Sequence, residues 1–276
     1  MAAHDHHSDG LATVLDLDAE VLRPFHADLA ERIAELAGTP PQRALDLGSG
    51  TGAGTFALLE HFPGLAVTAL DSSADMLAHL RGKAAERGLA SRVETARADL
   101  DEPLPELGGV DLAWASASLH HLADPDRALR EIARALRPGG LLVAVEMDAF
   151  PRFLPHDAEI GRPGLEDRIH AIVDERRGEH LPHFGAAWGE RIAAAGFAVE
   201  LERIVPVELT SPLPAAAVQY AEVALRHLRE SCRDRLDEDD RAALDELVDG
   251  DSPAAVRRRA DLTVRTSRQV TIARRR

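Results

Sequence analysis

Several features are scarce in this chain of 276 residues, and each scarcity narrows what the protein can be. Cys232 is the only cysteine, so no internal disulfide can form, and we expect a reducing, cytoplasmic location. No apolar run reaches the roughly 18–20 residues that a membrane span needs. The polar, acidic start, MAAHDHHSDG, is not typical of a signal peptide. We therefore expect no membrane partner.

Positive charge is scarce as well, because 32 lysines and arginines stand against 47 acidic residues and give a formal net charge of −15. A nucleic-acid-binding protein needs a concentrated positive field, so we expect no nucleic-acid partner. The basic runs at 257–259 and 274–276 are short and are typical of a solvated helix end and chain end. His4, His6 and His7 could bind a metal ion, but histidine-rich tails more often have no function, and we predict no metal site.

Hydrophobic residues make up 45% of the chain, which is enough for a core, and between residues 40 and 147 they form short runs that alternate with helical patterns. This alternation predicts an α/β fold with a doubly wound, parallel sheet that binds its ligand at the carboxyl ends of the strands. The predicted strands are 43–47, 66–70, 92–96, 110–115 and 141–146, and the predicted helices are 55–61, 71–87 and 126–136.

The rest of the chain follows other patterns. An amphipathic helix is predicted over 18–37, residues 148–186 have no clean periodicity, and 213–260 read as a helical block. Two late strands are predicted at 198–207 and 266–273. We predict one domain, residues 1–276, with a core of 40–147, 187–207 and 261–276 and a helical cap of 1–38, 148–186 and 210–260.

The stretch ALDLGSGTGAGT, residues 44–55, places four glycines directly after the first predicted strand. We expect no packing reason for so many glycines at this place. A strand that turns through Gly-x-Gly-x-Gly into a helix lets a ligand lie against bare backbone. A dinucleotide-binding loop has a similar pattern, so the loop alone does not choose between ligand classes.

Acidic residues at three successive strand ends narrow the choice. Asp46, two residues before the first glycine, is badly placed beside a pyrophosphate and well placed to receive an ammonium group. Asp71, in VTALDSS, can accept both hydroxyls of a ribose, and Asp99, in ARADL, can accept from an exocyclic amine. Together the three acids match one ligand in which an amino acid, a ribose and an adenine follow one another in a line. Each has a structural alternative, since Asp46 and Asp71 can cap the following helices and Asp99, with Asp101 as its rival, can be a loop acid.

Five motifs in order, ALDLGSGTG, TALDSSADML, ARADL, VDLAWASASLHHL and LRPGG, give the chain a resemblance to class I S-adenosylmethionine-dependent methyltransferases over about residues 40–147. It resembles the small-molecule branch with ubiquinone/menaquinone-type and sugar O-methyltransferases. The resemblance implies a Rossmann-like, seven-stranded, mostly parallel sheet with a reversed last strand, and S-adenosyl-L-methionine as cofactor. It implies that Asp46, Gly48 and Gly50 hold the methionine part, Asp71 the ribose, Met76, Asp99 and Leu100 the adenine, and that Ala115 and Ser116 border the sulfonium. Ser49 and Ser72 complete the predicted cofactor-binding set.

Two histidines and one acid stand where a methyl acceptor should lie. His120 and His121 follow the fourth strand and Glu146 ends the fifth, and neighbouring strands lie about 4.8 Å apart. A histidine beside a carboxylate is the usual form of a general base. The sugar O-methyltransferases that the chain resembles have His and then Asp at these places, so the extra methylene of Glu146 puts the geometry of the pair in doubt. His121 as the base, or no base at all, are the alternatives.

We therefore predict a methyltransferase that acts on a small molecule, most simply on a hydroxyl of a natural product or sugar. N- or C-methylation and a non-catalytic S-adenosylmethionine-binding protein are the alternatives. A nicotinamide oxidoreductase is disfavoured by Asp46 and by the lack of a Tyr-x-x-x-Lys pair. The acceptor pocket is predicted to use Phe150, Phe153, Phe184 and Trp188. His156, His180 and His183 could also be bases, with polar loop positions as the alternative. Tyr220, on the helix 213–231, could bond the substrate or pack, and the apolar stripe of that helix is expected in the core of the cap, with a homodimer face as the alternative.

Overall fold

The computed structural model describes residues 2–276, apart from the side chains of residues 2–9, 179 and 180. The side chains of His4, His6, His7 and His180 therefore lie outside the described part of the chain. Within that part, no helix combines the length and the apolar character that crossing a membrane requires.

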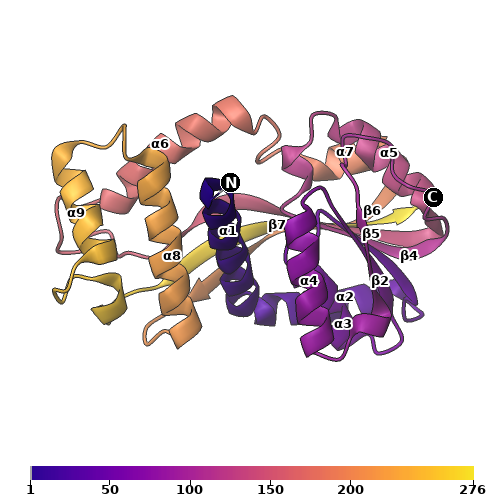
Figure 1. The fold of residues 1–276 in the computed structure, drawn as a ribbon. Helices are drawn as coiled ribbons and strands as arrows, with labels where there is room; N and C mark the ends of the chain where they lie inside the picture. The colour runs from indigo at the N-terminus through magenta and orange to yellow at the C-terminus, as the bar shows by residue number, and fades with distance from the viewer. Residues whose placement is uncertain (1) are drawn as a thin grey trace. The chain divides into compact units, whose positions relative to one another are not determined.

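Seven strands form one sheet in the order β3-β2-β1-β4-β5-β7-β6, and β7 is antiparallel (Figure 1). Strand β1 pairs in parallel with both β2 and β4, β2 pairs with β3, and β4 pairs with β5. This order confirms the predicted Rossmann-like, seven-stranded sheet with a reversed last strand. The strands are β1 (Arg43–Leu47), β2 (Ala66–Asp71), β3 (Val93–Arg97), β4 (Val110–Ser116), β5 (Leu136–Arg152), β6 (Phe197–Leu209) and β7 (Val264–Arg275).

The chain divides into two compact units, which we name by their content. The sheet unit comprises Leu22–Asp148, Gly185–Val205 and Arg268–Arg276, and the helical unit comprises Met1–Val21, Ala149–Phe184 and Pro206–Ser267. The domain prediction, one domain over 1–276 with cap elements, stays a prediction.

In the sheet unit, helices start where the sequence supplies caps. The side chain of Ser73 accepts the backbone N–H of Met76 at the start of α4, and Asp124 accepts that of Arg127 at the start of α5. Apolar side chains of the strands and of α5 pack together in a buried cluster that is shielded from water. The helices of this unit are α2 (Arg23–Ala37), α3 (Ala53–His61), α4 (Ala74–Glu86), α5 (Pro125–Ala135) and α7 (Trp188–Ala194), with the 3-10 turns η1 (Ala90–Arg92) and η2 (Leu119–His121).

Three elements differ from the sequence prediction. The single helix expected over 18–37 is two helices, because α1 ends at Val21 and Pro24, which lacks an N–H, occupies the first turn of α2. Strand β5 is longer than the predicted 141–146. It includes Arg137-Pro138-Gly139-Gly140, the residues that directly follow the predicted helix 126–136. Helix α6 (Leu165–His180) was not predicted, because two polar residues, Glu166 and His170, are buried among its apolar ones and disturb the helical pattern.

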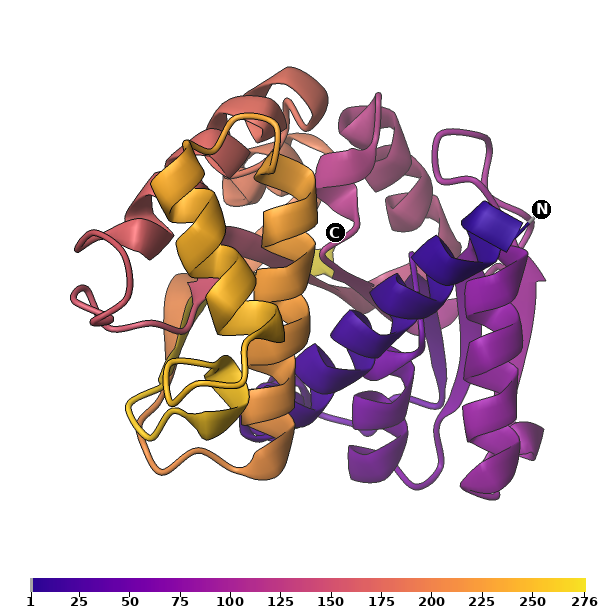
Figure 2. The same cartoon turned by 60° about the vertical axis from the view of Figure 1, so that its left-hand side comes forward.

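The helical unit contains α1 (Ala2–Val21), α6, α8 (Ala215–Cys232), α9 (Glu238–Asp249) and the 3-10 turn η3 (Val256–Arg258). Helices α1 and α8 lie side by side (Figures 1 and 2). The hydroxyl of Tyr220 on α8 donates to Asp18 of α1 at 2.6 Å, and its ring meets Phe153 edge to face, with centroids 5.3 Å apart. Of the roles that the sequence left open for Tyr220, packing is the one these contacts describe.

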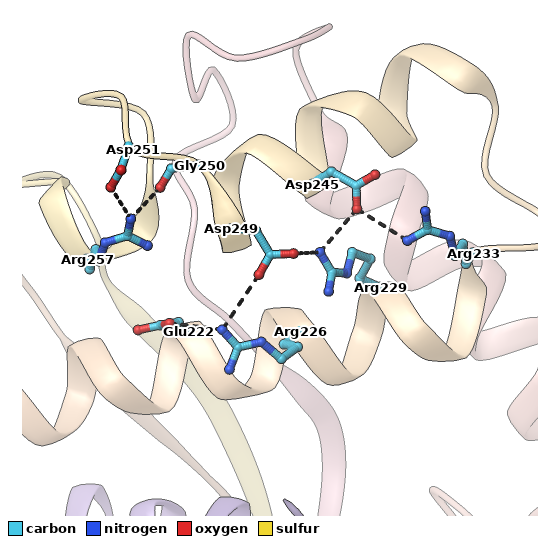
Figure 3. A network of polar contacts seen from close by, with 9 residues as sticks. All are labelled: Glu222, Arg226, Arg229, Arg233, Asp245, Asp249, Gly250, Asp251 and Arg257. Carbon is cyan, nitrogen blue, oxygen red and sulfur yellow. Dashed lines mark hydrogen bonds and ion pairs between the residues drawn. The ribbon is translucent and has the colours of Figure 1, made fainter.

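Oppositely charged side chains join α8 to α9 (Figure 3). Arg229 of α8, only 11% exposed, donates to Asp245 at 3.1 Å and to Asp249 at 2.5 Å. Arg226 and Arg233, one turn away on either side, lie 3.9 Å from Asp249 and 3.3 Å from Asp245. The charged residues of this segment therefore form a network between two helices, in which Arg229 is screened from solvent more than its neighbours.

The two basic runs are also paired within the fold, which corrects the expectation that they are merely solvated. Arg257 donates to Asp251 at 2.6 Å, and Arg274 forms an ion pair with Glu200 at 2.6 Å. Arg259 reaches Asp261 at 2.6 Å, and its side chain is only 7% exposed.

Candidate active site

The glycine loop leaves the carboxyl end of β1 in a conformation that only glycine adopts easily. Gly48, Gly50 and Gly52 have φ values of 69°, 50° and 90°, in the left-handed region. The turn is held by backbone bonds, since Ser49 N–H donates to the carbonyl of Leu70 on β2 at 2.9 Å. The loop therefore has a fixed shape beside the ends of β1 and β2.

Packing also requires glycine in this loop, which corrects the expectation drawn from the sequence. A Cβ on Gly54 would lie 2.2 Å from Nε1 of Trp114, and one on Gly48 would lie 2.6 Å from Cβ of Ser118. A Cβ on Gly52 would meet Leu80 at 2.8 Å. No real Cβ makes such contacts, so the glycines serve the close approach of loop, β4 and α4 as well as any ligand.

Asp46 is buried at the end of β1, with 2% of its surface exposed. Its Oδ2 accepts the backbone N–H of Thr55 at 2.9 Å and the Thr55 hydroxyl at 2.6 Å, near the start of α3. One oxygen therefore has the helix-capping role that the sequence left open. Burial raises the pKa of Asp46 to about 6, against the lowering effect of the two Thr55 bonds. Among the described residues Oδ1 has no hydrogen-bond partner.

Asp71 ties the glycine loop to the start of α4. Its Oδ2 accepts the N–H of Gly50 at 2.8 Å and its Oδ1 accepts the N–H of Ser73 at 2.8 Å. Ser73, not Ser72, caps α4, and the Ser72 carbonyl accepts from Arg97 at 2.9 Å. The structure thus brings Asp71 against the loop, as a ligand spanning both would require.

The residues expected around an adenine fall into two groups. Met76 and Leu100 are buried, at 7% and 8% exposure. Asp99 is exposed, and its Oδ1 accepts the N–H of Asp101 at 2.9 Å. Asp101 in turn accepts the N–H of Ala123 at 2.9 Å, so it connects the loop after β3 to the turn after η2. Asp99 thus lies in a loop that is held in place by the hydrogen bonds of Asp101, the alternative candidate for the adenine contact.

Three buried hydroxyls around the glycine loop have no hydrogen-bond partner within the described part of the chain: those of Ser49, Thr51 and Ser118. A buried hydroxyl without a partner costs about 1–3 kcal/mol, so such groups suit a site where a polar ligand completes their bonds. Ser49 was predicted from the sequence, whereas Thr51 and Ser118 were missed. Thr51 could have been found as a hydroxyl inside the glycine motif, but Ser118 approaches the loop only through the pairing of β4 with β1.

His120, in the turn η2 after β4, meets Glu146, which lies within β5 and does not end it as the sequence predicted. The register pairs Ser116 with Val145, and His120 Nδ1 lies 2.5 Å from Glu146 Oε2. The two side chains are 3% and 1% exposed. The second oxygen, Oε1, accepts the backbone N–H groups of Ser118 at 3.2 Å and Leu119 at 2.9 Å. The longer side chain of Glu146 therefore reaches His120. It is itself held by backbone N–H groups of the turn that carries His120.

His121 lies beside this pair but in a different environment. Its ring centroid is 4.2 Å from that of His120, with the rings tilted by 37°, and the residue is exposed. Partial desolvation and the neighbouring His120 hold the pKa of His121 below its ordinary value, so it is neutral at pH 7. Ala115 is buried in β4 and Ser116 ends that strand, so both precede the turn with the two histidines.

The four aromatic residues expected in an acceptor pocket do not all have the same surroundings. Phe153 is fully buried in the apolar core of the helical unit, and Trp188 is buried in that of the sheet unit, at 1% exposure. Phe150 and Phe184 are half-buried and stack on each other with centroids 6.0 Å apart. His156 is mostly exposed and lies 3.4 Å from Asp167. Only Phe150 and Phe184 therefore keep ring surface outside a core.

Comparison with known proteins places this geometry in a family. A family profile described as a methyltransferase domain matches residues 45–142. Demethylmenaquinone methyltransferase of Thermus thermophilus is 40% identical over 201 residues, which are 66% of this chain and 87% of the relative. Malonyl-[acyl-carrier protein] O-methyltransferase of Laribacter hongkongensis is 31% identical over 207 residues, 71% of this chain and 65% of the relative.

Solved structures agree at the level of the fold. A candidate methyltransferase of Bacillus halodurans superposes with a TM-score of 0.57 at 17% identity, over 90% of this chain and 97% of that one. The chain spans between 36% and 87% of the length of the first curated relatives that it matches. These matches confirm the resemblance drawn from the five motifs. The chain belongs to the class I methyltransferase family, whose cofactor is S-adenosyl-L-methionine.

Proposed function

We propose that this protein transfers the methyl group of S-adenosyl-L-methionine to a hydroxyl of a small molecule, with His120 as the general base. The observation that carries the proposal is the buried contact of 2.5 Å between His120, in the turn η2 after β4, and Glu146 within β5. A hydroxyl must lose its proton as it attacks a methyl group, and a positioned imidazole is the usual group for this task.

The groups around the glycine loop suit this cofactor. Asp46 Oδ1 would receive its ammonium group, and the partnerless hydroxyls of Ser49, Thr51 and Ser118 would complete their bonds with its polar atoms. Each oxygen of Asp71 accepts one bond from the backbone, which leaves lone pairs for the ribose hydroxyls. When bound, the cofactor supplies a methyl group activated by a positively charged sulfur.

Glu146 would set the protonation of the base. A carboxylate only accepts hydrogen bonds, so the proton on His120 lies at Nδ1, and Nε2 carries the lone pair that takes a proton from the acceptor. The backbone N–H groups of Ser118 and Leu119 hold Glu146 Oε1, so the imidazole orientation is fixed before an acceptor arrives. Such preorganisation is what a base dyad needs.

An acceptor screen tests the proposal. Formation of S-adenosylhomocysteine would be measured with matched pairs that differ only in the acceptor atom, such as phenol with aniline and cyclohexanol with cyclohexylamine. We expect turnover with hydroxyl members and little with the amines at the same pH. Turnover confined to amines would favour N-methylation, for which no base is required, and cofactor binding without turnover on any acceptor would favour a non-catalytic binding protein.

Cofactor affinity is expected to depend on pH through Asp46. Its pKa of about 6 means that the carboxyl is mostly ionised at pH 7.5 and mostly protonated at pH 5.0. Only the ionised form attracts an ammonium group, so the dissociation constant for S-adenosylhomocysteine should rise about tenfold between pH 7.5 and 5.0. Calorimetry at both pH values measures this. Asp46→Asn should bind weakly at both, with no such change; equal wild-type affinity at both pH values would contradict the assignment.

A further inference from the structure

Helix α6 carries a buried histidine that the proposed reaction does not use. His170 is 3% exposed, and its Nε2 has no hydrogen-bond partner within the described part of the chain. Burial, together with the guanidinium groups of Arg152 and Arg177, lowers the pKa of His170 to about 4, against the opposite effect of Asp167. The imidazole is therefore neutral at pH 7 and lies in a positive field.

Arg177 lies two turns further along the same face of α6. Seven residues correspond to about 10.5 Å of helix, and side chains on a helix lean toward its N-terminus, so the guanidinium leans toward His170. Its side chain is 12% exposed, and its Nη1 is buried without a partner among the described residues. Its Nη2 donates to Asp174.

Two aromatic rings hold this guanidinium in place. Its Cζ lies 3.8 Å from the ring centroid of Phe184 and 4.9 Å from that of Phe150, and the two rings stack at an interplanar angle of 30°. Cation–π contacts of this kind orient an arginine without using its N–H groups. Phe150 follows Glu146 by four residues in the chain.

The acids near these groups are already engaged. Asp167 pairs with Arg152 at 2.5 Å, and Asp174 accepts from Arg177 Nη2. Glu166 accepts the backbone N–H groups of Phe153 at 2.7 Å and Leu154 at 3.1 Å. Among the described residues, two buried nitrogens on one helix face therefore have no hydrogen-bond partner, and each costs about 1–3 kcal/mol unless a bound group supplies one.

We propose that His170 and Arg177 bind the carboxylate of a small molecule, whose ring or apolar body packs against Phe150 and Phe184 within the helical unit. A carboxylate offers two acceptor oxygens in one plane, which matches the fork of a guanidinium and a neighbouring imidazole N–H.

Calorimetry with benzoate and its neutral isostere benzamide tests the carboxylate site, on full-length protein saturated with S-adenosylhomocysteine. We expect benzoate to bind at least tenfold more tightly than benzamide. Arg177→Gln should weaken benzoate at least tenfold and leave benzamide unchanged. The matched control Arg203→Gln removes the same charge from an exposed position on β6 and should change neither affinity.

Equal affinities for the two ligands, absence of benzoate binding, or benzoate affinity that Arg177→Gln leaves intact would each overturn the proposal. A second measurement covers the case in which Arg177→Gln fails to fold: in wild-type protein labelled with ¹⁵N-histidine, benzoate should shift the Nε2 signal of His170, assigned with His170→Asn, and benzamide should not. A shift caused equally by both would also overturn it.

Discussion

Replacing His120 with alanine is expected to lower kcat by about 10²–10⁴-fold on a hydroxyl acceptor, while the dissociation constant for S-adenosylhomocysteine stays within about twofold. The proton at the acceptor would have no positioned group to receive it. The cofactor contacts proposed for the glycine loop and for Asp71 do not involve this imidazole. The measurement is a steady-state assay with the acceptor found in the screen, with calorimetry for the cofactor.

Two further variants separate the role of His120 from that of its neighbours. Glu146→Gln keeps the size of the side chain but removes the charge that favours the proton at Nδ1, so we expect a smaller loss of kcat, of about 10–10²-fold. His121→Ala should lose less than tenfold, because His121 is exposed and, in the described part of the chain, no hydrogen bond joins it to Glu146.

The opposite ranking would identify another base. A loss of 10²-fold or more in His121→Ala with near-normal activity in His120→Ala would assign the proton transfer to His121. Less than tenfold loss in both would mean that alignment alone drives the reaction. The thermal midpoint of each variant should be measured, because removal of a buried partner of Glu146 also destabilises the fold.

Gly54→Ala is expected to lower the thermal midpoint of unfolding by roughly 2–6 °C. The new Cβ would lie 2.2 Å from Nε1 and 2.6 Å from Cδ1 of Trp114, which is 1% exposed and cannot move into solvent. Overpacking of this kind costs about 1–3 kcal/mol, more than the ~1 kcal/mol that alanine gains over glycine inside a helix. The displaced loop should also weaken S-adenosylhomocysteine binding.

Gly82→Ala provides the matched control. Gly82 lies inside α4 and Gly54 lies in the first turn of α3, but among the described residues no atom beyond the chain neighbours and helix backbone of Gly82 lies within 4 Å of its added Cβ. The same substitution should therefore raise the thermal midpoint by about 1–3 °C through helix propensity alone. If both variants shifted the midpoint in the same direction, the close approach of the loop to Trp114 would not be the reason for glycine at position 54.

The sequence predicted the parts of the site that depend on neighbours along the chain. A positive φ favours glycine, and a Gly-x-Gly-x-Gly run after an apolar strand is a local pattern, so Gly48, Gly50 and Gly52 could be recognised without a structure. The alternation of apolar runs with helical patterns predicted the sheet.

The prediction was weakest where buried residues are polar or where a segment has no local signal. Helix α6 was missed because Glu166 and His170 occupy buried positions that a pattern of apolar residues does not reveal. Phe153 and Trp188 were expected to line a pocket and instead fill two cores. An aromatic side chain in an irregular segment carries no signal of the direction in which it will pack.

The family and the order of the strands could thus be predicted from local conformation and from motifs read along the chain. The partners of the charged groups could not, because they depend on contacts between distant segments. Asp46 meets Thr55 through the turn of the glycine loop, and His120 meets Glu146, 26 residues away, through the register of β4 on β5. A shift of that register by one residue would turn the strand-end side chains to the opposite face, so the contact exists only once the whole sheet has formed.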